Sequence, residues 1–136
     1  MSSRKNGQRN AENSKIFEFS ASIIRCYTEG GADIIGIGDD PVNPKNYLII
    51  SGFDDGDIGN SIGLLSSAWL NEAYDCIKSI KVNNAEILIN INESKLLKTE
   101  ISLIKINLNE SNSDLNLMLH YMRKIFSDST VGWDEA

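Results

Sequence analysis

The 136-residue sequence has one histidine, two cysteines, two prolines and no apolar stretch long enough to cross a bilayer. A membrane-spanning helix needs about 20 consecutive apolar residues, whereas the apolar runs here are interrupted by charged residues or asparagine. The start of the chain, Met1 to Lys15, lacks the apolar segment of a secretory signal. These absences predict a soluble, cytoplasmic protein without a membrane span.

The cysteines and the histidine do not form a pattern that is typical of catalysis or metal binding. Cys26 and Cys76 have no Cys or His at metal-ligand spacing, and they suit a reduced, cytosolic protein. Both lie in strand-like segments with apolar residues nearby, and the sequence places no general base or helix N-terminus beside them, so buried thiols are favoured over a catalytic thiolate. His120 falls on the polar side of an expected helix, without partners for a triad. We therefore expect a binding protein without a resident cofactor or metal, not an enzyme.

Negative charge is concentrated in the middle of the chain. Residues 29–75 include nine acidic residues and a single basic one, Lys45, which gives this stretch a net charge of −8. Residues 1–15 carry +3, residues 16–28 are neutral and residues 76–136 carry −1. A field of one sign disfavours nucleic acid as a partner and favours a basic protein, although the same charge also suits a surface kept soluble by repulsion.

Short β-branched and aromatic segments bounded by turn residues predict a series of strands. The expected strands span residues 16–27, 33–37, 46–51, 75–82, 86–91 and 100–108. The first three are expected to form a meander through a tight Glu29-Gly30-Gly31 connection, and Asn83-Asn84 is expected to be a hairpin turn that tolerates positive φ. Residues 62–70 fit either a strand or a short helix, and residues 93–98 fit one helical turn.

The C-terminal helix has the clearest pattern. Ser111 and Asp114 have the spacing of a capping box. Apolar residues then recur at helical spacing, namely Leu115, Met118, Leu119, Met122, Ile125 and Phe126. We therefore predict an α+β domain over residues 15–128, with a mainly antiparallel sheet packed against this amphipathic helix. Residues 1–14 are expected to be a disordered polar tail and residues 129–136 a C-terminal tail, in which Trp133 either packs back on the sheet or makes a second contact.

The candidate binding residues are acids in two predicted loops, together with the aromatic and acidic residues that follow the second loop. Aromatic side chains beside charges are typical of interface hot spots, although Trp69 equally fits a core position. The candidates are Asp39, Asp40, Asp54, Asp55, Asp57, Trp69, Glu72 and Tyr74. Neighbouring carboxylates also serve as acid-base or metal-binding groups, so a small metal-dependent or acid-base enzyme that uses the loop aspartates is the alternative interpretation.

The order of these features resembles the Immunity protein 10 family, bacterial antidotes to polymorphic and contact-dependent toxins. The resemblance depends mainly on Ile34-Ile35-Gly36-Ile37-Gly38-Asp39-Asp40, Pro44 and Asn46-Tyr47-Leu48-Ile49-Ile50. Shorter matches follow in order at Asp57-Ile58, Glu72, Tyr74, Ile77, Leu88-Ile89, Ile91, Leu97 and Leu119 through Ile125-Phe126, so that the resemblance covers residues 17–127. It implies an immunity protein that binds a cognate toxin domain and neutralises it. If the toxin is a nuclease, the loop carboxylates are expected to take the place of phosphates in its basic groove.

At two places the chain differs from the pattern of that family. Ser51-Gly52 stands where Gln-Arg commonly follows the strand, and Ala73-Tyr74 stands where Asp-Gln commonly follows the glutamate aligned with Glu72. Immunity proteins vary most where they touch their toxin. The resemblance therefore implies the class of activity and leaves the particular toxin open.

Overall fold

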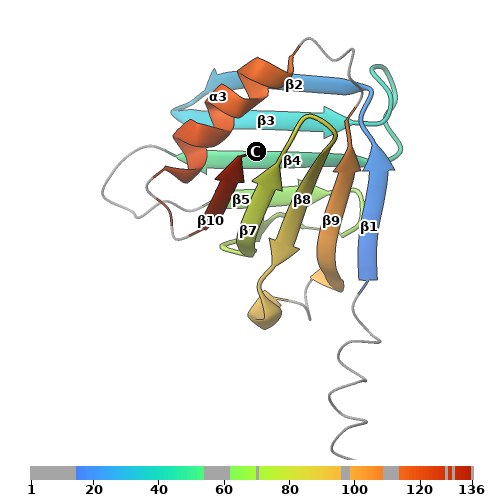
Figure 1. The fold of residues 1–136 in the computed structure, drawn as a ribbon, viewed down its shortest axis with the longest axis vertical. Coiled ribbons are helices and arrows are strands. Elements are labelled where there is room, and N and C mark those ends of the chain that lie inside the picture. Colours follow the sequence, from blue (N-terminus) through green and yellow to red (C-terminus); the bar gives the residue numbers. More distant parts are fainter. Residues whose placement is uncertain are drawn as a thin grey trace, which may run out of the picture.

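The computed structural model describes residues 15–53, 62–69, 71–95, 99–108, 114–127, 129 and 131–135. These residues form two five-stranded sheets and the C-terminal helix α3 (Leu115–Phe126), which confirms the predicted α+β class. The two sheets lie face to face, and the strands of one run across those of the other (Figure 1). The tail predicted over residues 1–14 lies outside the described residues.

The first sheet, which we call the meander sheet, has the strand order β2-β3-β4-β5-β6, and all its neighbouring strands are antiparallel. Its strands are β2 (Ile23–Glu29), β3 (Ala32–Gly38), β4 (Tyr47–Phe53), β5 (Ile62–Ser66) and β6 (Ala73–Tyr74). Gly30 and Gly31 both have positive φ, so the tight connection predicted between the first two strands of the meander is present. Residues 62–66 form a strand, which resolves the ambiguous pattern there.

The second sheet, which we call the terminal sheet, has the order β1-β9-β8-β7-β10. Its strands are β1 (Lys15–Ser20), β9 (Ile101–Asn107), β8 (Glu86–Ile91), β7 (Ile77–Val82) and β10 (Gly132–Glu135), and a short 3-10 helix η1 (Glu93–Lys95) follows β8. The three central strands are antiparallel to one another. Both edge strands are parallel to their neighbours. The sheets are thus mainly antiparallel, as predicted, with two parallel pairs at the edges of one of them.

The first expected strand, residues 16–27, is divided between the two sheets. Its N-terminal part is β1 and its C-terminal part is β2. Two backbone hydrogen bonds fix the bend between them: the Ala21 amide donates to the Asn107 carbonyl at 2.9 Å, and the Ser22 amide donates to the Gly38 carbonyl at 2.8 Å. Before the bend the buried residues, Phe19 and Ala21, have odd numbers, whereas after it the buried residue Ile24 has an even number. The alternation of buried and exposed residues is therefore shifted by one residue at the bend.

The turn between β7 and β8 lies at the predicted place but is closed differently. The Asn83 amide donates to the Glu86 carbonyl at 3.1 Å. The Asn83 side-chain oxygen accepts hydrogen bonds from the amides of Ala85 and Glu86, at 2.8 and 2.9 Å. Neither Asn83 nor Asn84 has positive φ, so the side chain of Asn83, and not a left-handed backbone, stabilises the turn.

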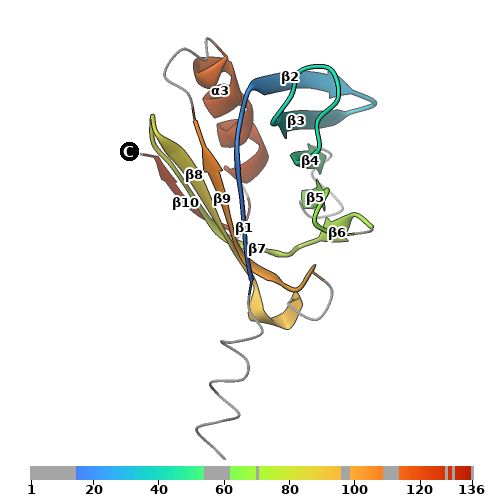
Figure 2. The same ribbon diagram turned by 90° about the vertical axis from the view of Figure 1, so that its right-hand side faces the viewer.

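Helix α3 lies between the two sheets, on the inner side of both (Figure 2). It begins at Leu115 with Asp114 as its N-cap residue, and the side chain of Asp114 makes no capping hydrogen bond. Ser111, the other member of the expected capping box, lies outside the described residues, so the box stays a prediction. The side chains that α3 buries are Met118, Met122, Ile125 and Phe126, and they join the aliphatic core contributed by both sheets.

Part of the segment expected to be a C-terminal tail, residues 129–136, is the strand β10. The Trp133 ring stacks on the Phe126 ring with centroids 5.9 Å apart, and Arg123 forms an ion pair with Glu135. These contacts join β10 to α3, while its backbone pairs with β7. Of the two expectations for Trp133, packing back on the fold is the one observed. The stacking of Trp133 on Phe126 could not be predicted from the sequence, because the four residues of β10 do not alternate between apolar and polar.

Substitution of Gly52 is expected to disturb the contact between β4 and α3. A Cβ at Gly52 would lie 2.8 Å from Ile125 Cγ2, so that Gly52→Ala forces Ile125 or the helix to move. We expect this variant to lose about 1 to 3 kcal/mol of unfolding free energy, as overpacked cores do. Denaturation in urea measures the loss.

The matched control is Gly36→Ala on the adjacent strand β3. A Cβ at Gly36 would meet no atom nearer than the Arg25 carbonyl oxygen at 3.9 Å. Its stability should therefore be unchanged or slightly raised, because alanine restricts the unfolded chain more than glycine does. Equal losses in the two variants would contradict a close contact at Gly52.

Candidate functional site

The carboxylate of Asp39 organises the loop between β3 and β4. It accepts hydrogen bonds from the Lys45 backbone amide at 2.9 Å and from the Asn46 side-chain amide at 3.0 Å. Desolvation is the largest single influence on the pKa of Asp39 and raises it, but the hydrogen bonds from Asn46 and Lys45 together outweigh it and hold the pKa below its ordinary value. A general acid needs the opposite, a raised pKa.

Asp40 closes a tight turn in the same loop. Its Oδ2 accepts hydrogen bonds from the amides of Val42 and Asn43, at 3.0 and 2.7 Å. This Asx turn leaves the side chain of Val42 89% exposed. Asp39 and Asp40 were predicted as binding residues, and the structure gives both a role in holding their own loop. Direct contact of either carboxylate with a partner stays a prediction.

The other predicted loop acids, Asp54, Asp55 and Asp57, lie outside the described residues, between β4 and β5. Among the residues that the structure does describe, no group of three or more His, Cys, Asp or Glu side chains could hold a metal ion. The enzymatic alternative relies on the loop aspartates. It therefore stays a prediction, as does the role of these three carboxylates in binding.

His120 lies at the surface, and the Cys26 thiol is partly buried. The His120 side chain is exposed and lies edge-on to Tyr121, with ring centroids 6.0 Å apart. Burial, and after it the charge of Asp114, raises the pKa of Cys26 to about 11. The thiol is therefore protonated at neutral pH, whereas a catalytic cysteine needs a lowered pKa.

The outer face of the meander sheet is turned away from α3 (Figure 2). Most of its side chains are apolar or aromatic, and Arg25 and Glu29 of β2 lie on it as well. Strand pairing aligns them in rows, so that Tyr27 lies opposite Ile34 and Ile49 lies opposite Leu65. Tyr27, Phe53 and Tyr74 are each 46 to 48% exposed. The residues that we call the aromatic face are Tyr27, Ile34, Tyr47, Ile49, Phe53, Leu65 and Tyr74.

The outer face of the terminal sheet carries charged side chains beside apolar ones, such as Ile16, which is 63% exposed and lies opposite Leu103. Glu18 lies opposite Lys105 on β1 and β9, and Asp134 lies opposite Lys81 on β10 and β7. Charged side chains of both signs, alternating with buried aliphatic ones, are the usual pattern of a sheet with one face in water. The outer face of the meander sheet has fewer charged side chains, namely Arg25 and Glu29 on β2, and more exposed aromatic ones. Exposed apolar surface of this kind is typical of an interaction surface.

Glu72 lies at the edge of the aromatic face, and two hydroxyl groups hold its carboxylate. The Tyr74 hydroxyl donates to Oε1 at 2.6 Å and the Ser51 hydroxyl donates to Oε2 at 3.1 Å. A Cβ on Gly63 would lie 2.9 Å from the Glu72 carboxyl carbon, so any side chain there would displace the carboxylate from its present position. The hydrogen bond to Glu72 and then its charge raise the pKa of Tyr74, which keeps the phenol protonated as the donor. We call Ser51, Gly63, Glu72 and Tyr74 the Glu72 cluster.

The sequence-predicted candidates are thus divided by the structure. Glu72 and Tyr74 come together beside Ser51, near the end of β4, whereas Asp39 and Asp40 follow β3 at the other end of β4. Trp69 packs against the core, and its Nε1 donates to the Leu64 carbonyl at 3.3 Å. Of the two interpretations of Trp69, the core position therefore fits its surroundings better.

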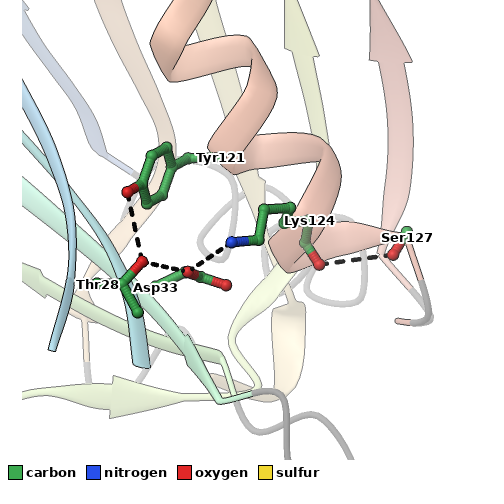
Figure 3. Close-up of polar contacts among 5 residues, drawn as sticks. All are labelled: Thr28, Asp33, Tyr121, Lys124 and Ser127. Carbon is green, nitrogen blue, oxygen red and sulfur yellow. Dashed lines mark hydrogen bonds and ion pairs between the residues drawn. The ribbon is translucent and has the colours of Figure 1, made fainter. Parts of the chain in front are cut away.

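One buried charge was missed by the sequence analysis. Asp33 is 5% exposed, and its Oδ1 accepts hydrogen bonds from the Thr28 hydroxyl at 2.8 Å and from Lys124 Nζ at 3.1 Å (Figure 3). The Tyr121 hydroxyl lies 3.3 Å from the Thr28 hydroxyl oxygen, so this cluster joins α3 to β2 and β3. The alternation of the strand could have revealed this residue. It puts Asp33 on the same inward side as Ile35, and a buried polar side chain needs a hydrogen-bonding partner.

No protein-family model matches this chain, and no curated protein sequence matches it. None of the described helices has the length and apolar character that crossing a membrane requires. The function is therefore inferred from the two sheet faces and from the Glu72 cluster.

Replacing Lys124 by methionine tests the link between α3 and the meander sheet. Methionine keeps the apolar stem but leaves the buried Asp33 carboxylate without its cation, and we expect a loss of about 1 to 3 kcal/mol of unfolding free energy. Arg123→Met is the matched control, since the pair of Arg123 with Glu135 lies at the surface and exposed ion pairs contribute little to stability. Urea denaturation compares the two, and a larger loss for Arg123→Met would contradict this account.

Titration of Asp39 tests its role in the loop. Because the folded-state pKa is lowered, we expect the Asp39 contribution to stability to be present above the unfolded-state pKa and lost as the pH falls through the folded-state value. Carboxyl-carbon NMR shifts of Asp39 should therefore titrate at lower pH in the folded protein than in the urea-unfolded protein. Coincident midpoints would mean that the hydrogen bonds from Lys45 and Asn46 do not hold in solution.

Proposed function

We propose that this protein is an immunity protein, which binds a cognate toxin domain in the cytoplasm and neutralises it. The observation that carries the proposal is the contrast between the two outer sheet faces. Every strand of the terminal sheet carries a charged side chain on its outer face, whereas the aromatic face of the meander sheet has three exposed aromatic side chains, those of Tyr27, Phe53 and Tyr74. A protein partner that covers the aromatic face would remove this apolar surface from water, which is the main favourable term in association.

Charge supports a basic partner for this surface. The strands β3 to β6 belong to the acidic stretch of residues 29–75, which has a net charge of −8. Steering by such a field raises the rate of encounter with a positively charged protein, in a way that salt weakens. A toxin domain with a basic substrate groove has the charge that this field attracts.

The resemblance to the Immunity protein 10 family points to the same surface. Ser51 and Tyr74 occupy the two places where the chain differs from the family pattern, and both donate hydrogen bonds to Glu72. Since immunity proteins vary most where they touch their toxin, the Glu72 cluster is a reasonable point of contact. The inhibitor acts by occupying the toxin surface, so it needs no catalytic group of its own.

Co-expression with the toxin domain encoded beside this protein tests the proposal. We expect the protein to restore the growth of cells that express the toxin and to bind the purified domain with a Kd in the nanomolar range or tighter, about −12 kcal/mol. The double variant Tyr27→Ser, Phe53→Ser should weaken both effects, because it removes exposed aromatic anchors. Lys81→Ser on the terminal sheet is the control and should retain them.

Two results would count against the proposal. One is a toxin domain that neither binds this protein nor is neutralised by it. The other is saturable calcium or magnesium binding by the isolated protein, measured by calorimetry, which would favour the metal-dependent enzyme that the loop aspartates allow as an alternative.

A further inference from the structure

We infer that Glu72 is the specificity anchor of the aromatic face, and that it accepts an arginine of the toxin whose guanidinium stacks on the ring of Tyr74. The inference rests on the proposed function and deepens it, since it names the chemical group on the partner. It follows from the geometry of the Glu72 carboxylate, from its charge and from the exposed ring beside it.

The Glu72 carboxylate is fixed in place before any partner arrives. Each of its oxygens accepts one hydroxyl hydrogen bond, from Tyr74 at 2.6 Å and from Ser51 at 3.1 Å. An ionised carboxylate offers about four acceptor positions in all, so both oxygens keep capacity for a further donor. Because the side chain is already ordered, binding to it costs less conformational entropy than binding to a mobile surface glutamate.

The charge of Glu72 is not neutralised within the described part of the chain. The ion pairs found there join Arg123 to Glu135 and Lys124 to Asp33. Glu72 has hydroxyl partners instead, which orient the carboxylate but leave its full negative charge. A half-buried carboxylate beside an apolar face, held by neutral donors, is therefore complementary to a cation supplied from outside the protein.

Arginine fits this position better than lysine does. Its planar guanidinium can donate two parallel hydrogen bonds to one carboxylate and at the same time stack on an aromatic ring, whereas a lysine ammonium is a single point charge. The Tyr74 ring is 48% exposed and directly adjoins the carboxylate through its own hydroxyl. A partner seated on the adjoining aromatic face would exclude water from the pair, which strengthens the charge interaction.

A second copy of this chain is the competing occupant, because Arg25 on β2 lies on the same outer face, opposite Gly36. Pairing two copies through this face would also bring together two acidic stretches, each with a net charge of −8 over residues 29–75. That repulsion favours a basic partner over a second copy. Sedimentation of the free protein should accordingly find a monomer.

The test compares Glu72→Gln with Glu86→Gln in binding to the catalytically inactivated toxin domain. Glutamine keeps the shape and the hydrogen-bonding capacity of the side chain but removes the charge, and Glu86 lies on the outer face of the terminal sheet. We expect Glu72→Gln to raise the Kd at least tenfold and to flatten its dependence on salt, while Glu86→Gln leaves both within twofold. Tyr74→Phe, which keeps the ring, should weaken binding less than Tyr74→Leu.

Urea denaturation of each variant, with a midpoint close to that of the wild type, separates lost binding from lost folding. A Kd for Glu72→Gln equal to that of the wild type would overturn the inference and leave the proposed function standing. A wild-type protein that does not bind the toxin domain would overturn both. A concentration-dependent dimer that is abolished by Arg25→Gln would assign Glu72 to a second copy and would also overturn the inference.

Discussion

The packing of α3 between the two sheets is the constraint on which the rest of the structure depends. A sheet can bury one face against a core, and two crossed sheets leave an opening between them that must be filled. Met118 and Met122 of α3 fill it together with Ile125, which approaches Gly52 so closely that no side chain fits there. Because α3 takes the inner side of the meander sheet, the outer side is left for other contacts, and this is where the aromatic face lies (Figure 2).

Elements with local pairing could be predicted from the sequence. The hairpin between β2 and β3 depends on Gly30-Gly31, and the hairpin between β7 and β8 depends on Asn83, so each pairs residues that are near in the chain. The parallel pairs of β1 with β9 and of β10 with β7 join distant segments, and no local pattern specifies them. Four residues of β10 cannot display a strand periodicity, and contacts of Trp133 and Glu135 with α3 decide their position instead.

The candidate site was predictable as a set of residue types but not as an arrangement. Glu72 and Tyr74 were recognisable because aromatic and acidic residues adjoin in the sequence. Ser51 and Gly63 complete the cluster from two other strands, and their small size carries no signal until the strands are paired. Charge alone was a poor guide in the loop after β3, since an aspartate at the start of a turn often accepts backbone hydrogen bonds, as Asp40 does here.

Acidic residues contribute to binding in two ways, through the long-range field and through close ion pairs, and net charge does not distinguish them. The partners that each acid has within the protein do. Lys124 neutralises Asp33, whereas the neutral donors around Asp39 and Asp40 orient those carboxylates without cancelling their charge. Long-range steering depends on total charge, so the loop acids still contribute to it even if they never touch a partner. Dissociation depends on close pairs that lose water on binding. Among the described acids of this stretch, Glu72 combines a fixed orientation, a charge not cancelled by a described cation and a place at the edge of the aromatic face. It is therefore the residue on which the lifetime of a complex through this face should depend.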